Sequence, residues 1–268
     1  MGLRCTLRLP EGKGPFRLVI TAPGFLGFKD WGFLPYVGQR LCQTGFAALS
    51  FSHALCGVDE NPLEITDLEA FSNNSTTQEL KDWDLILDWI LAGRLPYWEK
   101  LKVNAFGIVG HSRGGSYGIL MASRVPQIQS VVTWGAIQTF HRFDAETQRR
   151  WRQAGSIEIG ANAFGSTLRL QLGALEALER NSDQLDVLRA MRHLSIPVLL
   201  LHGREDKRVP VAEGLQLWQC ADQRLSRFHI IESAGHTFRT RHPFTVASQP
   251  LLEGVNETLR WFGKTLPI

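Results

Sequence analysis

Short apolar runs alternate with segments of helical spacing along most of the 268-residue chain. The apolar runs lie at residues 46–51, 103–109, 130–134, 196–201 and 228–231, and strands buried on both faces of a parallel sheet have this composition. Helical spacing occupies residues 31–43, the stretch that begins at 75–77, the stretch after residue 115, and residues 211–221 and 247–263. This alternation predicts an α/β fold in which helices flank a mostly parallel central sheet.

The first strands of the sheet are expected at residues 3–9 and 16–22. The segment between them, Glu11 to Pro15, contains two glycines and a proline, so we expect a turn that joins the two strands into a hairpin. Residues 52–74 mix glycine, proline and asparagine with little periodicity, and they are predicted to form a long loop with short turns.

The alternation lapses between residues 137 and 192, where the chain is polar and helix-like. We interpret this segment as a small helical cap, inserted over the working edge of the sheet, and assign residues 1–136 and 193–268 to the core. The length suits one large domain with an insertion, and the chain contains neither an internal repeat nor a low-complexity linker.

The strand predicted at residues 103–109 runs directly into a glycine-boxed serine. Gly110, Ser112 and Gly114 spell G-x-S-x-G, the sharp strand-to-helix turn that lifts a serine hydroxyl above the edge of a sheet. Glycine suits the flanking positions because a side chain there would collide with the neighbours of the strained turn. The five-residue pattern alone is moderately specific, but the preceding strand and the following helix support it.

A serine nucleophile needs a base to take its proton and a carboxylate to orient that base. Glu205 and Asp206 follow the strand at residues 196–201, at the edge where Ser112 is expected. We prefer Asp206 as the acid, with Glu205 as the alternative. Asp206 would otherwise cap the helix that starts near Pro210, which would leave the serine without its acid.

The best candidate for the base among eight histidines is His236, in a loop of small residues after the strand at residues 228–231. His242 also follows that strand and is the main competitor, although it stands directly before Pro243. The chain order serine, acid, histidine favours Ser112, Asp206 and His236 as a catalytic triad.

Charge and cysteine usage exclude several other classes of protein. The 29 Lys and Arg residues and 26 Asp and Glu residues give a net charge of +3, and the basic residues are scattered, so we expect no nucleic-acid partner. The four cysteines are widely separated, which indicates free thiols in a reducing compartment and no metal site. Neither a secretory leader nor a membrane-spanning run is recognisable, so we expect a soluble, cytoplasmic protein without a membrane partner. The oligomeric state is not determined, and a homodimer stays open.

Four motifs make the chain resemble the α/β-hydrolase superfamily over nearly its whole length, and within it the small esterases and dienelactone-hydrolase-like proteins. They are Pro-Gly-Phe-Leu-Gly at 23–27, Gly-His-Ser-Arg-Gly-Gly at 110–115, His-Gly-Arg-Glu-Asp at 202–206 and Ala-Gly-His at 234–236. The resemblance implies an oxyanion hole formed by the backbone amides of Phe25 and Arg113, no cofactor, and a cap that selects the substrate. Many relatives carry histidine where this chain has Pro23, which affects the support of the Phe25 loop rather than its amide.

The leading hypothesis is therefore a serine hydrolase that cleaves small to medium carboxylic esters through an acyl-enzyme on Ser112. In similar folds, dehalogenases and epoxide hydrolases carry aspartate at the nucleophile position. Thioesterase, peptidase and acyltransferase activities stay open because one triad serves all acyl transfer, and a non-catalytic binding scaffold is the remaining alternative.

Basic residues near the start of the predicted cap indicate which esters could be preferred. Arg142, Arg149, Arg150 and Arg152 stand against only two acidic residues, so a basic cap entrance would favour esters with a free carboxylate. The alternative is that these arginines form a solvated helix face unrelated to the substrate.

Overall fold

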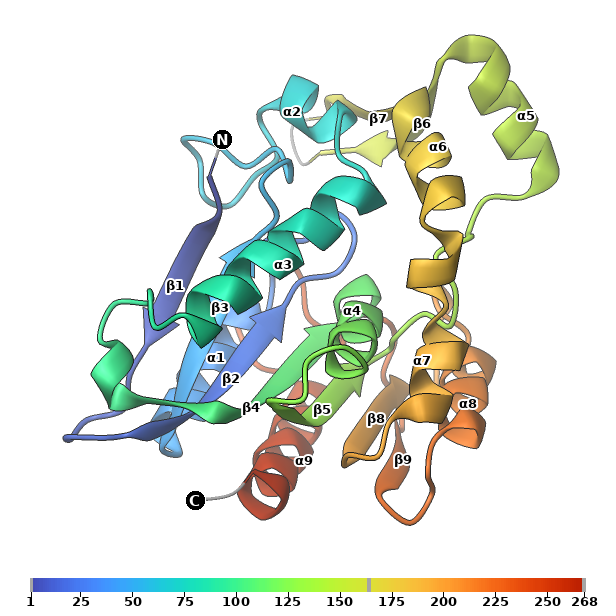
Figure 1. The fold of residues 1–268 in the computed structure, drawn as a ribbon. Coiled ribbons are helices and arrows are strands. Elements are labelled where there is room, and N and C mark those ends of the chain that lie inside the picture. Colours follow the sequence, from blue (N-terminus) through green and yellow to red (C-terminus); the bar gives the residue numbers. More distant parts are fainter. Residues whose placement is uncertain (1, 163–164, 267–268) are drawn as a thin grey trace.

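A seven-stranded sheet forms the centre of the computed structural model, which describes residues 2–162 and 165–266 (Figure 1). The strands, in their spatial order, are β1 (Arg4–Arg8), β3 (Phe46–Ser52), β2 (Phe16–Ala22), β4 (Leu101–His111), β5 (Ile128–Trp134), β8 (Val198–Gly203) and β9 (Ser226–Ile231). Every pairing from β3 across to β9 is parallel, and only β1 is antiparallel to its neighbour. The prediction of a mostly parallel α/β sheet is confirmed.

Helices cover both faces of this sheet, with α3 and α4 in front of it and α1 behind it in Figure 1. The main helices are α1 (Leu34–Gln43), α3 (Thr76–Leu91), α4 (Arg113–Ala122), α8 (Val211–Cys220) and α9 (Gln249–Thr265), and a short helix α2 (Leu68–Ser72) lies within the long loop. Successive strand residues point to opposite faces, so Leu18 and Ile20 belong to the core cluster that α3, α4 and α8 share, whereas Val19 belongs to the cluster that α1 and α9 share.

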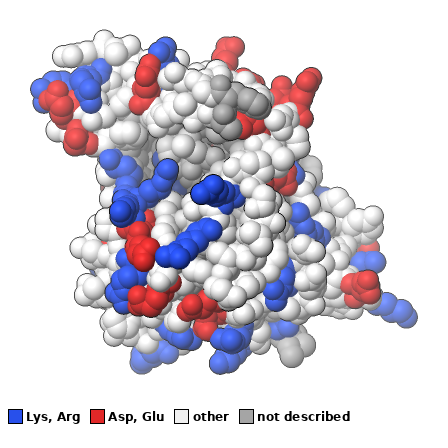
Figure 2. Space-filling view, turned by 180° about the vertical axis from the view of Figure 1, so that it is seen from behind, with Lys and Arg blue, Asp and Glu red and all other residues white. Residues whose placement is uncertain are grey.

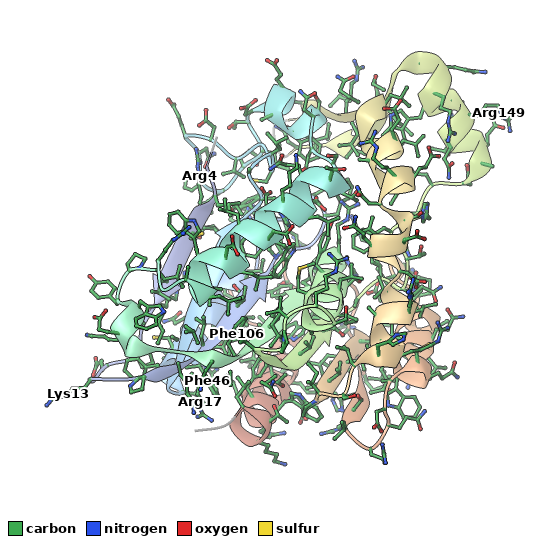
Figure 3. The ribbon with its side chains drawn as sticks, viewed as in Figure 1. Arg4, Lys13, Arg17, Phe46, Phe106 and Arg149 are labelled. Atoms are coloured by element: carbon green, nitrogen blue, oxygen red, sulfur yellow. The ribbon has the colours of Figure 1, made fainter. Side chains whose placement is uncertain are left out.

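Local sequence explains where several of these elements begin. The hydroxyl of Ser75 accepts the amide of Gln78 at 3.3 Å and thereby caps α3, and the hydroxyl of Ser248 caps α9 in the same way. Helix α4 begins at Arg113, two residues earlier than its apolar spacing indicates. Where β2 and β3 begin, the Arg17 side chain packs over the ring of Phe46, with its guanidinium carbon 4.4 Å from the ring centre (Figure 3).

The predicted hairpin between the first two strands is wrong in its pairing. Strand β1 pairs with β3, with Thr6 opposite Ser50, and does not pair with β2. Both edges of β2 are taken by parallel neighbours, β3 on one side and β4 on the other. The free edge for β1 therefore lies beyond β3, and the turn at Glu11 to Pro15 only leads the chain back towards β2.

The segment between residues 137 and 192 contains strands as well as helices. Its elements are α5 (Ala145–Ala154), β6 (Ser156–Ala161), β7 (Thr167–Gln171), α6 (Leu172–Arg180), the 3₁₀ turn η2 (Ser182–Leu185) and α7 (Val187–His193). Strands β6 and β7 form an antiparallel pair, so the expectation of helices alone is wrong here. Trp151 and Leu170 share a small core with Phe71 of the long loop, whereas α7 packs on α4 and α8.

Charged side chains of both signs are mixed over the face seen in Figure 2, without one continuous basic surface. No helix within the described ranges has both the length and the apolar composition needed to cross a membrane.

Candidate active site

Ser112 lies at the sharp turn between β4 and α4, with φ 54° and ψ −124°. Its amide donates a hydrogen bond to the carbonyl of Trp134 at 2.8 Å, which ties the turn to β5. A Cβ added to Gly110 would lie 2.3 Å from the carbonyl oxygen of Gly114, and one added to Gly114 would lie 2.3 Å from that of Pro23. Both positions therefore exclude a side chain, as the motif predicts.

Asp206 and His236 lie in the loops that follow β8 and β9, and their side chains are in contact. The Nδ1 atom of His236 is 2.7 Å from Oδ2 of Asp206, while Oδ1 accepts the amides of Arg208 and Val209, each at 2.9 Å. Burial alone would raise the pKa of Asp206, but the hydrogen bond and charge of His236 and the two amides together lower it. An ionised carboxylate holds the imidazole proton on Nδ1 and leaves Nε2 as the acceptor.

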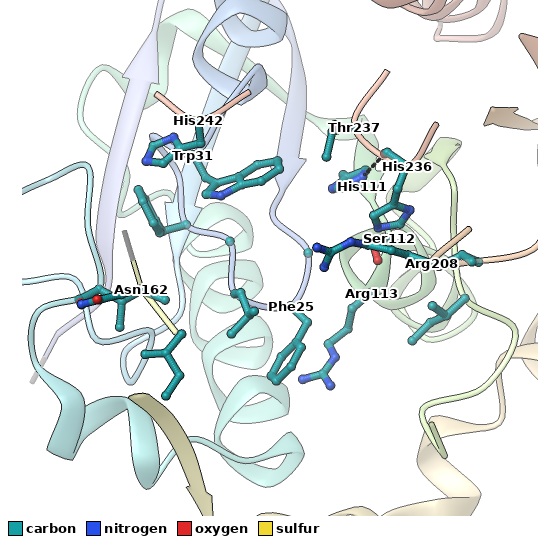
Figure 4. A pocket seen from close by; sticks show the side chains of 18 of the residues that line it. Phe25, Trp31, His111, Ser112, Arg113, Asn162, Arg208, His236, Thr237 and His242 are labelled. Atoms are coloured by element: carbon teal, nitrogen blue, oxygen red, sulfur yellow. Dashed lines mark hydrogen bonds between the residues drawn. The ribbon is translucent and has the colours of Figure 1, made fainter. Parts of the chain in front are cut away.

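Ser112 and His236 line the same cavity and lie next to each other in Figure 4. The loop that carries His236 is held by His111, whose Nε2 donates to the carbonyl of His236 at 2.9 Å. Burial, aided by the charge of His236, lowers the pKa of His111 to about 3, so this imidazole is neutral at physiological pH. It stacks on Trp31 with ring centres 5.9 Å apart. The motif at 110–115 contains His111 but carries no sign of this supporting contact.

The competing candidates occupy other environments. Glu205 has a side chain that is 55% exposed, and its ionic contact is with Arg239 at 3.6 Å. His242 accepts the amide of Gly32 on Nδ1 at 2.8 Å and donates from Nε2 to the carbonyl of Leu63 at 2.6 Å. Both ring nitrogens of His242 are therefore committed to the backbone, and the geometry groups the serine with the preferred acid and histidine.

Of the two amides expected to form the oxyanion hole, that of Phe25 belongs to the loop after β2 and that of Arg113 directly follows Ser112. Phe25 is in a tight turn closed by the amide of Gly27 and the carbonyl of Gly24, 3.0 Å apart, and Arg113 is the first residue of α4. A Cβ on Gly24 would lie 3.0 Å from Cβ of Ser112, so this loop packs directly against the serine. Among hydrogen bonds within the described residues, neither the Phe25 nor the Arg113 amide acts as a donor. Unused amides at a helix start and in an adjacent turn can bind a developing anion.

The side chain of Arg113 points away from the serine into a buried network. Its Nη1 is 3.3 Å from both carboxylate oxygens of Glu79, which also accept the hydroxyl of Tyr117 at 2.8 Å and the amide of Asn74 at 2.9 Å. Burial would raise the pKa of Glu79, but Arg113 and the other donors lower it. The guanidinium carbon lies 4.1 Å from the ring centre of Phe25 (Figure 4). The Arg113 side chain thus contacts both Glu79 of α3 and Phe25 of the loop after β2.

The cavity beside Ser112 has a volume of about 440 Å³. Its apolar lining comes from the loop after β2, the long loop, the segment after β5, strand β7 and the loop after β8: Phe25, Leu26, Phe28, Trp31, Leu63, Ile65, Ile137, Leu168 and Val209. Ile137 and Leu168 belong to the segment predicted to form the cap, so this segment contributes directly to the wall that faces Ser112.

The predicted basic entrance is wrong in most of its residues. Arg149, Arg150 and Arg152 do not line the cavity, and Arg149 points outward from α5 in Figure 3. The cause is the orientation of α5, which buries Trp151 against the small core and leaves its arginines in solvent. Of the four arginines only Arg142 reaches the cavity.

Arg208, two residues after Asp206, is not among the residues that the sequence motifs identify, although its exposed side chain lines the cavity. Its position beyond β8, at the same sheet edge as Ser112, was the available signal. The direction of its side chain depends on how the loop folds back, which the sequence pattern does not specify.

The four cysteines have free thiols, as the sequence predicts. Within residues 2–162 and 165–266, no group of three or more histidine, cysteine, aspartate or glutamate side chains is arranged to hold a metal ion.

The chain is similar in sequence to a known protein family and to a characterised hydrolase. Residues 19–249 match the family model described as the alpha/beta hydrolase family. A 2,6-dihydropseudooxynicotine hydrolase from Paenarthrobacter nicotinovorans is 25% identical over 77% of this chain, and the chain spans about half (48%) of that protein's length.

Two solved structures show the same fold at low sequence identity. Est1E from Butyrivibrio proteoclasticus, with ferulic acid bound, superimposes with a TM-score of 0.73 at 18% identity, covering 98% of this chain and 96% of that one. Dienelactone hydrolase from Anabaena variabilis gives a TM-score of 0.60 at 19% identity, with 99% and 93% covered. These likenesses establish the fold that the four sequence motifs indicate.

Proposed function

Because the chain belongs to the alpha/beta hydrolase family, we propose that it hydrolyses carboxylic esters by way of an acyl-enzyme on Ser112. The observation that carries the proposal is the 2.7 Å contact between Asp206 and His236 at the wall of the cavity that also holds Ser112. A hydroxyl is a weak nucleophile at neutral pH, and an adjacent imidazole oriented by a carboxylate is the arrangement that activates it.

In the first half of the reaction, Oγ of Ser112 attacks the ester carbonyl carbon while Nε2 of His236 takes the hydroxyl proton. Asp206 stabilises the imidazolium that forms. Collapse of the tetrahedral intermediate breaks the bond to the leaving alkoxide, which receives the proton from His236 and departs as the alcohol. In the second half, His236 takes a proton from water, the hydroxide attacks the acyl carbon, and the carboxylic acid leaves as the proton returns to Ser112.

The amides of Phe25 and Arg113 stabilise the oxyanion in both tetrahedral intermediates. Their assignment is supported by the packing of the Phe25 loop against Ser112 and by the position of Arg113 at the start of a ten-residue helix. Removing one such donor costs about 10²- to 10³-fold in kcat in enzymes of this kind. We therefore assign the amides the main electrostatic role in the reaction.

Residues 137–192 act as the cap in this proposal, because they supply Ile137, Arg142 and Leu168 to the cavity wall. A cavity of about 440 Å³ suits substrates of small to medium size. The same triad would also serve thioesters, peptides or transfer of the acyl group to an alcohol, so the leaving group needs a direct test.

The test is to compare kcat/KM for an ester, a thioester and an anilide that carry the same hexanoyl group. We expect turnover of the ester to exceed that of the anilide by at least about 10²-fold, because an amine is a poorer leaving group and must be protonated first. A preference for the thioester would reassign the chain as a thioesterase. Absence of turnover together with failure of Ser112 to react with a fluorophosphonate would favour a binding scaffold.

A further inference from the structure

Three guanidinium groups line the cavity beside Ser112, and they differ in whether their charge is already balanced. Arg113 is 3.3 Å from Glu79, and Arg142 is paired with the carboxylate of Glu213. Arg208 has no acidic partner within 4 Å in the part of the chain that the structure describes. Glu64 also lines the cavity but forms no ion pair with Arg208, so the Arg208 guanidinium has donors that no carboxylate of the described residues occupies.

The backbone of Arg208 is fixed on both sides. Its amide donates to Oδ1 of Asp206 at 2.9 Å, and its carbonyl accepts Nη2 of Arg142 at 2.9 Å. From this anchored position the side chain extends towards Ser112 in Figure 4. It also lies close enough to His111 for its charge to be felt there. The guanidinium is thus held near the reacting atoms while its donors face the cavity.

We infer that Arg208 binds a carboxylate on the substrate, so that the preferred substrates are esters with a second, ionised carboxyl group on an apolar chain. This inference rests on the proposed ester hydrolysis. A guanidinium binds carboxylate through two parallel hydrogen bonds, and one guanidinium without an ion-pair partner can bind one carboxylate in this way. The remaining walls are mostly apolar and suit the hydrocarbon part. On the face seen in Figure 2, acidic and basic side chains are mixed, so the inference depends on Arg208 at the cavity and not on the charge of that face.

The test uses two 4-nitrophenyl esters of adipic acid, one with a free distal carboxylate and one with an N-methyl amide in its place. In the wild-type chain, kcat/KM should be about 10- to 100-fold higher for the acidic ester. Arg208→Gln should bring this ratio close to one, and Arg208→Lys should keep part of it. Arg149→Gln, on the outer side of α5, is the matched control and should leave the ratio unchanged. Equal ratios in wild type and Arg208→Gln would overturn the inference.

A binding measurement separates this inference from the proposed function. The same two esters are titrated by calorimetry into the Ser112→Ala variant, with and without Arg208→Gln. Tighter binding of the acidic ester that disappears with Arg208→Gln supports the carboxylate subsite, whatever the rate of turnover. Equal binding of both esters to Ser112→Ala, while the wild-type chain hydrolyses esters, refutes the subsite and leaves ester hydrolysis standing.

A separate set of contacts, behind the serine, joins the two amides of the oxyanion hole. The Arg113 guanidinium lies over the Phe25 ring at 4.1 Å and bonds on its other side to Glu79, whose side chain is 4% exposed. Tyr117 and Asn74 hold the Glu79 carboxylate. We propose that Arg113 and Glu79 are positioning residues that set the spacing between the amides of Phe25 and Arg113. An oxyanion donor must lie within a few tenths of an ångström of its ideal distance, so small shifts of the Phe25 turn lower the rate.

The test measures kcat, KM and the affinity for a trifluoromethyl ketone that mimics the tetrahedral intermediate. Phe25→Leu keeps the ion pair and should lower kcat and inhibitor affinity together, by about 3- to 30-fold, whereas any change in KM reports its separate contact with the cavity. The double variant Glu79→Gln with Arg113→Met avoids an unpaired buried charge and should lose as much or more. Arg113→Lys retains a cation over the ring and should recover part of the loss.

A double-mutant cycle between Phe25→Leu and the paired change Glu79→Gln with Arg113→Met decides whether these residues position the amides or only stabilise the fold. If the fold-loss of inhibitor affinity in the combined variant is smaller than the product of the two separate fold-losses, the residues share a positioning role. Strictly multiplicative losses, or a lower melting temperature with unchanged inhibitor affinity, would show that the network only stabilises the fold.

Discussion

Replacement of Ser112 by alanine should lower kcat for ester hydrolysis by roughly 10⁴- to 10⁶-fold, as when a triad loses its nucleophile. No acyl-enzyme can form without Oγ, while the oxyanion amides and the cavity stay in place, so a small residual rate and a near-normal KM are expected. The same variant should no longer react with a fluorophosphonate, and intact mass spectrometry checks this directly. His236→Ala should be similarly severe, because it leaves the serine hydroxyl without a base.

Ser123→Ala is a suitable control for this prediction. Ser123 lies at the C-terminal end of α4, the helix that follows Ser112, where its exposed hydroxyl donates to the carbonyl of Leu120. This variant should keep its activity and its labelling. Labelling that persists in Ser112→Ala would move the nucleophile to another residue and remove the basis of the proposed function.

The parallel core could be predicted because burial on both faces leaves a clear mark on its strands. The run 196–201 is apolar at every position and 130–134 contains Val131, Val132 and Trp134, and both become central strands, β8 and β5. Ser112, Asp206 and His236 could be located for a related reason. Each follows a parallel strand, and the carboxyl ends of parallel strands lie at one edge of the sheet.

Features that depend on contacts between segments distant in the sequence could not be predicted in this way. The partner of β1 depends on which sheet edge stays free, and the local pattern that suggests a hairpin carries no information about it. Strand β7 was hidden because Leu168 and Leu170 lead without a break into α6, so Leu170 also fits a helical spacing. The arginines of α5 were misplaced because the burial of Trp151 alone determines which way that helix faces.

Asp206→Asn should lower kcat/KM by about 10³- to 10⁴-fold, while Glu205→Gln should change it by less than about threefold. In the native site, Oδ1 of Asp206 accepts two amides and Oδ2 faces Nδ1 of His236 at 2.7 Å. The asparagine oxygen would keep the two amides, which places its NH₂ group against Nδ1. That NH₂ is a donor, so the imidazole must carry its proton on Nε2 and can no longer accept the proton of the serine.

The fold should survive this substitution because the hydrogen bonds that hold the loop are retained, and melting curves of the two variants provide the check. The effect should therefore appear in kcat and in the rate of fluorophosphonate labelling, with KM nearly unchanged. Glu205 is 55% exposed and its contact with Arg239 is 3.6 Å long, so losing its charge removes only a weak surface interaction. If Glu205→Gln were the more damaging change, the loop would have to rearrange on substrate binding so that Glu205, and not Asp206, orients the base.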